Sequence, residues 1–163
     1  MPTNQPIVLL RERSGDRYLP IWIGAAEATA IAYAQQGVVP PRPLTHDLLK
    51  DVVTALGQSL LRVRVDELRD RVFYATLEIG RVAGAGTALE RAGRGVTEVS
   101  ARPSDGIALA LRAGAPIVVA EEVFAAAGIT MAPEEDDEVE RFREFLDQVS
   151  PEDFEGPAPS PGA

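Results

Sequence analysis

The chain has 163 residues, enough for one compact domain, and its lack of cysteine excludes disulfides, thiolate metal sites and a cysteine nucleophile. It has no apolar run of 18 residues, and its N-terminus lacks the basic and apolar regions of a secretory signal. No membrane span is therefore predicted, and the cytoplasm is the expected location. The net charge of −9 lies in residues 134–155, which hold 11 acids and 2 bases, whereas the remaining chain carries 14 of each. A neutral body neither attracts nor strongly repels a polyanion such as nucleic acid.

The first third of the chain predicts a β-hairpin followed by a helix. Apolar runs at 7–10 and 18–23 flank a turn at Ser14-Gly15-Asp16. The Ala-rich stretch 25–36 has apolar residues at helical spacing, and Gly37 is a natural stop for it.

A second helix is predicted over residues 46–56, after a proline-rich connector at 38–43. Its apolar residues recur at helical spacing, and we expect them to face the core. These residues are Leu48, Leu49, Val52, Val53 and Leu56.

The middle of the chain predicts an antiparallel pair of strands. Leu61, Val63 and Val65 alternate with arginines, which gives one buried and one exposed face, and 66–70 is the expected turn before a strand at 72–79. Residues 80–95 are rich in Gly, Ala and Arg and predict a flexible hairpin loop. The strand expected after this loop covers residues 96–101.

The last third predicts mostly helices. A helix over 105–113 ends at Gly114, and a short buried strand at 117–120 leads to a short helix at 121–127. Residues 134–149 have apolar side chains at helical spacing on an acidic background.

The predicted fold class is α+β. We expect a single compact domain over residues 1–133, with a mixed, mostly antiparallel sheet packed with helices. An acidic, amphipathic C-terminal helical segment at 134–155 and a disordered tail at 156–163 complete the expected organisation.

One local pattern occurs twice, each time where a helix should begin: Arg42-Pro43-Leu44-Thr45-His46-Asp47 and Arg102-Pro103-Ser104-Asp105. Proline pushes the preceding residue into an extended conformation, so Thr45 and Ser104 are the expected N-caps, with Asp47 and Asp105 in the first turns. Free N–H groups at helix N-termini favour anions such as phosphate.

The pattern has a functional and a structural interpretation. Arg42 and Arg102 suit phosphate recognition, which capping does not need, whereas a salt bridge to a nearby carboxylate is the structural alternative. His46, the only histidine, is a candidate general base beside Asp47, or it merely lies near the surface.

Four further residues carry two interpretations each. Glu27 either complements the dipole of its helix or contributes a carboxylate to a cleft. Glu122, beyond a strand end, is either a ligand-site acid or a helix-start charge. Trp22 and Tyr18 would stack nucleic-acid bases or pack in the core.

Several blocks resemble the bifunctional nuclease domain family in the family's order. The opening block is Asp16-Arg17-Tyr18-Leu19-Pro20-Ile21-Trp22-Ile23-Gly24, and Arg42-Pro43-Leu44-Thr45-His46-Asp47-Leu48 follows it. Phe73-Tyr74-Ala75 and Ala101-Arg102-Pro103-Ser104-Asp105-Gly106-Ile107-Ala108-Leu109-Ala110 come next, and Ser150-Pro151-Glu152-Asp153-Phe154 resembles the ending of bacterial single-domain members.

The resemblance implies cleavage of DNA and RNA, a compact α/β fold and self-association as a trimer or a larger homo-oligomer. Nucleic acid is then the expected partner. The resemblance brings no settled catalytic residues, so the site residues are inferred from the matching motifs. Two features depart from the family pattern: a strand before Asn4-Gln5-Pro6 is missing, and 80–95 is longer than the usual turn.

Two hypotheses follow for function. In the first, the protein is a phosphodiesterase with His46, Asp47 and Asp105 as catalytic residues, and its phosphate-binding residues are Arg42, Thr45, Arg102 and Ser104. Its Mg²⁺ or Mn²⁺ would be held by Asp47, Asp105 and Glu122. In the second, the protein is a non-enzymatic regulatory or interaction module that binds a small anion or a protein partner, as the neutral body favours.

Overall fold

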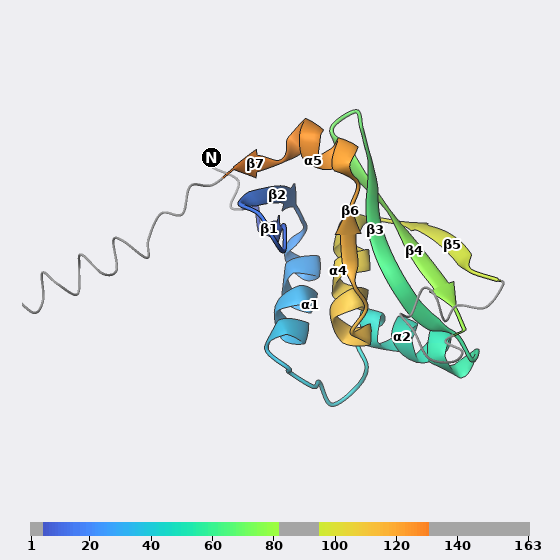
Figure 1. The fold of residues 1–163 in the computed structure, drawn as a ribbon. Helices are drawn as coiled ribbons and strands as arrows, with labels where there is room; N and C mark the ends of the chain where they lie inside the picture. The colour runs from blue at the N-terminus through green and yellow to red at the C-terminus, as the bar shows by residue number, and fades with distance from the viewer. Residues whose placement is uncertain (1–4, 82–94, 131–163) are drawn as a thin grey trace, which may run out of the picture. The chain divides into compact units, whose positions relative to one another are not determined.

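The computed structural model describes residues 5–81 and 95–130, in which two β-sheets combine with four helices (Figure 1). The first sheet has the order β1-β2-β7 and consists of β1 (Ile7–Arg11), β2 (Arg17–Trp22) and β7 (Ile129–Thr130). The second has the order β5-β4-β3-β6 and consists of β3 (Ser59–Arg69), β4 (Val72–Gly80), β5 (Thr97–Ala101) and β6 (Ile117–Val119). The helices are α1 (Ala25–Gln35), α2 (Thr45–Ala55), α4 (Pro103–Ala113) and α5 (Glu121–Ala127).

Strand pairing confirms the predicted α+β class with a mixed, mostly antiparallel arrangement. The pairs β1–β2, β3–β4 and β4–β5 are antiparallel, and β3–β6 is parallel. The predicted loop at 80–95, apart from its ends, lies outside the described residues. So do the predicted helical segment at 134–155 and the tail at 156–163.

The core forms where α4 packs against β3 and β4. Leu61, Val63 and Val65 are at most 1% exposed, as their alternation with arginines predicts. Gly106 makes the close approach of α4 possible, because a Cβ atom there would lie 2.7 Å from Cγ1 of Val63. The N-terminal turn of α4 is thereby held tightly on the sheet.

The predicted turn at 66–70 is wrong, because β3 continues to Arg69 and pairs with β4 up to Val72. The reversal is a two-residue turn at Asp70 and Arg71, whose φ angles are +52° and +64°. Residues 66–69 belong instead to a long strand, on which Glu67 and Arg69 are exposed.

The expectation that the apolar residues of α2 face inward is also wrong. Leu48, Val52 and Leu56 are 56%, 46% and 70% exposed, whereas the polar residues His46 and Asp47 are half-buried. The two polar side chains bond to α4, and those bonds set the rotation of α2 about its own axis. Among the described helices, none is long and apolar enough to cross a membrane.

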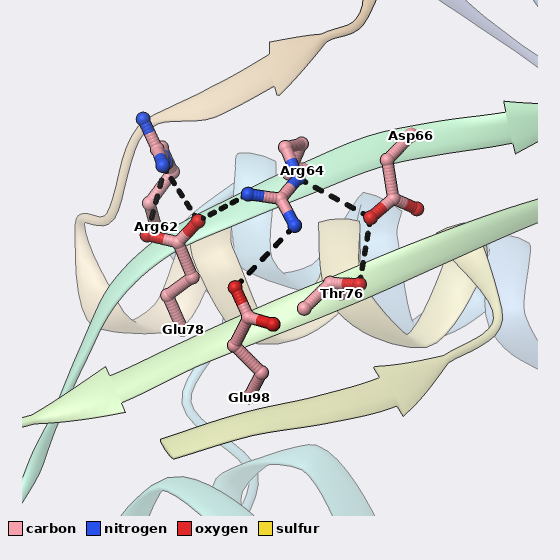
Figure 2. Close-up of polar contacts among 6 residues, drawn as sticks. All are labelled: Arg62, Arg64, Asp66, Thr76, Glu78 and Glu98. Carbon is pink, nitrogen blue, oxygen red and sulfur yellow. Dashed lines mark hydrogen bonds and ion pairs between the residues drawn. The ribbon is translucent and has the colours of Figure 1, made fainter. Parts of the chain in front are cut away.

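The face of the second sheet opposite the helices carries a polar network (Figure 2). Glu78 is 3% exposed and accepts hydrogen bonds from Arg62 at 3.1 and 2.6 Å and from Arg64 at 2.9 Å. Arg64 also donates to Asp66 at 3.2 Å, and Thr76 donates to the same oxygen at 2.7 Å. Because two guanidinium groups compensate the buried carboxylate, these arginines serve the sheet itself.

Candidate functional site

The two repeated motifs begin α2 and α4, but the expected N-caps are wrong. Leu44 and Arg102 are the N-caps, in extended conformation, so Thr45 and Ser104 lie inside the helices. In α4, Pro103 takes the first helical position, where its missing N–H is tolerated. In α2, the Asp47 carboxylate accepts a hydrogen bond from the Leu44 N–H at 2.9 Å, which secures the helix start without Thr45.

The structure brings His46 of the first motif to Asp105 of the second, 59 residues away in sequence. Nε2 of His46 lies 3.2 Å from Oδ1 of Asp105. The imidazole is 13% exposed and the carboxylate 31%, so the pair is partly shielded and still reachable from solvent. A histidine oriented by a carboxylate is a common acid–base unit in enzymes.

Arg102 joins this pair to a third element. Its Nε donates to Oδ2 of Asp105 at 2.7 Å, and its Nη2 donates to Oδ1 at 3.0 Å. The same Nη2 lies 2.8 Å from Oε1 of Glu27, in the first turn of α1. Glu27 therefore contributes its carboxylate to the cluster, which the sequence left open between two interpretations.

The pKa of Asp105 reflects these contacts. Partial burial would raise this pKa, but the hydrogen bonds from Arg102 and His46 outweigh burial and lower it below its usual range. The carboxylate is therefore ionised at neutral and mildly acidic pH, as an orienting partner of His46 must be.

We expect Asp105 to stabilise the fold at pH 5 and to lose this effect in stronger acid. A carboxylate whose pKa is lower in the folded state contributes stability above its unfolded pKa and loses it as pH falls through the folded value. The measurement is the free energy of unfolding in urea for His46→Gln and for His46→Gln combined with Asp105→Asn, so that no imidazole titrates. The difference between these proteins should shrink below about pH 4, and an equal difference at pH 5 and pH 3 would contradict the ion-pair assignment.

Asp47 does not join the same cluster, because its carboxylate turns to Arg112 in the last turn of α4. Nε of Arg112 donates to Oδ1 of Asp47 at 2.6 Å, and Oδ2 already accepts from Leu44 N–H. Partial burial raises the pKa of Asp47, but these two hydrogen bonds lower it by more. The geometry thus gives Asp47 a role in fixing α2, next to His46.

The other predicted site residues lie apart from this cluster. Arg42 and Thr45 are exposed, and within the described ranges neither makes an ion pair or side-chain hydrogen bond to the cluster. Glu122 is exposed on α5, which packs against β2 and β3. Over residues 5–81 and 95–130 no three His, Asp or Glu side chains are grouped to hold a metal ion, so Asp47, Asp105 and Glu122 do not form such a set.

A family model described as the bifunctional nuclease domain matches residues 8–132, most of the chain and both motifs. The chain belongs to the bifunctional nuclease domain family. The matched range contains all the residues of the His46–Asp105 cluster. The resemblance to this family is thereby confirmed for the blocks between residues 16 and 110, whereas the block at 150–154 lies outside the matched range.

Relatives of this bifunctional nuclease domain occur in bacteria and plants. Two uncharacterized proteins of Mycobacterium tuberculosis, from strains CDC 1551 / Oshkosh and ATCC 25618 / H37Rv, are 53% identical over 162 residues. Each alignment covers 94% of this chain and 90% of the relative. Bifunctional nuclease 1 of Oryza sativa subsp. japonica is 24% identical over 116 residues, which are 71% of this chain and 33% of the plant protein.

Sequence reasoning missed Arg112, although a signal for it exists. Asp105 and Arg112 are seven residues apart, nearly two full helical turns, so both lie on one face of α4. The adjacent residues of α2 each contact one of these two: His46 contacts Asp105, and Asp47 contacts Arg112. In this member of the family, two neighbouring polar residues of α2 are therefore matched to one stripe of α4.

Proposed function

We propose that this protein is a nuclease, a phosphodiesterase acting on DNA, RNA or both, with His46 and Asp105 at its centre. The observation that carries the proposal is the 3.2 Å contact of the chain's only histidine with a carboxylate from a different helix. Membership in the bifunctional nuclease domain family and the names of the plant relatives support the same chemistry.

The contact with Asp105 favours one tautomer of His46. An ionised Asp105 can only accept a hydrogen bond, so a neutral imidazole would carry its proton on Nε2, and Nδ1, which has no partner among the described residues, would be an acceptor. Nδ1 can then take a proton from a water molecule, or from a ribose 2′-hydroxyl, as that oxygen attacks phosphorus. Asp105 holds the ring and stabilises the imidazolium that forms.

Arg102 supplies the positive charge nearest to the pair. Its Nε and Nη2 are engaged by Asp105 and Glu27, and the described residues give its Nη1 no partner. The side chain is 66% exposed, so Nη1 can donate to a phosphate oxygen of a substrate that reaches the pair. The carboxylates that hold the guanidinium fix the direction of this donor.

Dependence on Mg²⁺ or Mn²⁺ stays part of the proposal. Among the described residues no three ligand side chains are grouped, and both oxygens of Asp105 already accept hydrogen bonds from Arg102. Magnesium sites in phosphate-processing enzymes often use only one or two carboxylates, with water and substrate oxygens as the remaining ligands. Such an ion would stabilise the charge on the phosphate, and the carboxylates of the cluster that would hold it are Asp105 and Glu27, whose oxygens keep further lone pairs beside their contacts with Arg102.

The test is cleavage of supercoiled plasmid and of a structured RNA by highly purified protein, in Mg²⁺, in Mn²⁺ and in EDTA. We expect the wild-type protein to cut and Asp105→Asn, purified identically, to lose about 10²-fold or more in rate. Loss of cutting in EDTA would establish the metal requirement. Equal cutting by both proteins would contradict the site.

Absence of cutting under every condition would instead support the regulatory or interaction module. That alternative predicts a saturable rise in melting temperature with a small anion or a protein partner. Self-association stays a prediction as well, and the exposed apolar side chains of α2 are where such a contact would form.

A further inference from the structure

A cleft beside the His46–Asp105 pair combines an exposed aromatic ring with two arginines. It has a volume of about 290 Å³ and lies where the end of β2, the β3–β4 turn and the N-terminus of α4 meet. Trp22, Arg71 and Arg102 are among the residues that line it. Because Arg102 also binds Asp105, the cleft and the His46–Asp105 pair share one guanidinium.

Trp22 is exposed on a strand whose alternate residues are buried. The indole is 58% exposed, whereas Leu19 and Ile21 on the same strand are 0% and 4% exposed. The interpretation of Trp22 as a core residue is therefore wrong. An exposed tryptophan at the wall of a cleft is a typical recognition element, because its large ring offers contact area at little entropic cost.

Arg71 reaches the cleft from a backbone conformation that arginine rarely adopts. Its φ of +64° is the left-handed conformation that glycine or asparagine usually supplies in a two-residue hairpin turn. No carboxylate of the described residues lies within 4.0 Å of its guanidinium. The turn thus places at the cleft an arginine that no carboxylate in the described part of the chain neutralises, at the expense of backbone strain.

Ser104 adds a neutral hydrogen-bonding group to the same cleft. It is only 7% exposed and lines the cleft, and over residues 5–81 and 95–130 its hydroxyl has no hydrogen-bond partner. Buried polar groups are nearly always hydrogen-bonded, so this hydroxyl suits an oxygen supplied by a ligand.

We infer that this cleft binds one nucleotide of single-stranded nucleic acid, an inference that rests on the proposed nuclease function. The base stacks on Trp22, and the adjoining phosphate contacts Arg71 and Arg102. Aromatic rings next to cationic groups are how proteins bind single strands without regard to sequence. A duplex keeps its bases paired and stacked, so they are not free to enter the cleft. The cleft volume of about 290 Å³ lies just below the range for small-molecule pockets, about 300–1,000 Å³, which suits a single nucleotide.

The chain's single tryptophan makes the inference directly testable. Emission of Trp22 is recorded while a short oligothymidylate, its duplex with oligoadenylate, or inorganic phosphate is added, in EDTA and again in Mg²⁺. We expect saturable quenching by the single strand, weaker quenching by the duplex and none by phosphate alone. Equal responses to single strand and duplex would overturn the preference for single strands.

Variants then test the two binding groups, with anisotropy of a labelled single strand as the readout. Trp22→Ala and Arg71→Ala should each weaken the apparent affinity by about tenfold or more. Tyr33→Ala and Arg13→Ala, exposed residues outside the cleft, are the matched controls and should bind like the wild type. Unchanged affinity in both cleft variants would overturn the inference.

The outcomes also separate this inference from the proposed nuclease function. Cleavage by the wild-type protein with no response of Trp22 to the single strand would overturn the cleft and leave the nuclease assignment standing. A saturable response of Trp22 without cleavage would uphold the cleft and remove the nuclease assignment.

Discussion

Replacing His46 with alanine is expected to slow cleavage of plasmid and RNA by about 10²–10⁴-fold, the range that a positioned general acid or base contributes. The expectation follows from geometry, because the imidazole is held 3.2 Å from Asp105 and no second histidine exists in the chain to replace it. The measurement is the initial cleavage rate at saturating substrate, with imidazole added to the variant to restore part of the rate.

The fold should tolerate this change, which separates a chemical from a structural role. Asp105 keeps two hydrogen bonds from Arg102 when the imidazole is removed, so no carboxylate is left unpaired. The free energy of unfolding of His46→Ala should therefore lie within about 1 kcal/mol of the wild-type value. If cleavage persists at the wild-type rate, His46 is not the base.

A double-mutant comparison sharpens the result. If His46 and Asp105 act as one unit, His46→Ala combined with Asp105→Asn should cleave about as slowly as His46→Ala alone. Independent roles would instead make the two losses multiply. The second outcome would assign Asp105 to substrate or metal binding rather than to orientation of the ring.

The fold was largely predictable because local signals and burial agreed. The elements of the structure match two such signals, which are the alternation of Leu61, Val63 and Val65 with arginines and the helix stops at Gly37 and Gly114. The rotation of α2 was not predictable, since its apolar spacing favoured the opposite orientation. Two polar bonds to α4 decided it, and periodicity counts apolar side chains without weighing such tertiary contacts.

The candidate site was predictable only in part, for a similar reason. The repeated motif correctly indicated that Arg102 and Asp105 lie close together, and the structure shows them hydrogen-bonded at the start of α4. It could not show that His46 meets Asp105 rather than the adjacent Asp47. Neighbours in a helix point about 100° apart, so the partner of each is set by whatever packs against that helix.

Replacing Arg112 with alanine should destabilise the protein by roughly 2–4 kcal/mol, as breaking a largely buried ion pair usually does. The side chain is 7% exposed and donates to Asp47 in α2 at 2.6 Å. It also donates to the carbonyls of Ala30 in α1 at 3.0 Å and of Ala108 in α4 at 2.9 Å. One guanidinium therefore ties three helices together, and urea unfolding measures its contribution.

Arg69→Ala is the matched control, since Arg69 is 57% exposed and its ion pair with Glu67 lies in solvent. An exposed pair contributes at most about 1 kcal/mol, so a similar loss in both variants would contradict a special role for Arg112.

Adding Asp47→Ala to Arg112→Ala should cost less than the sum of the single changes, because the two residues share one contact. Since α2 carries His46 next to Asp47, Arg112→Ala should also slow cleavage at temperatures where the variant is still folded. Arg112→Lys keeps the charge but not the planar fork. Its stability and its cleavage rate should therefore lie between those of the wild type and Arg112→Ala.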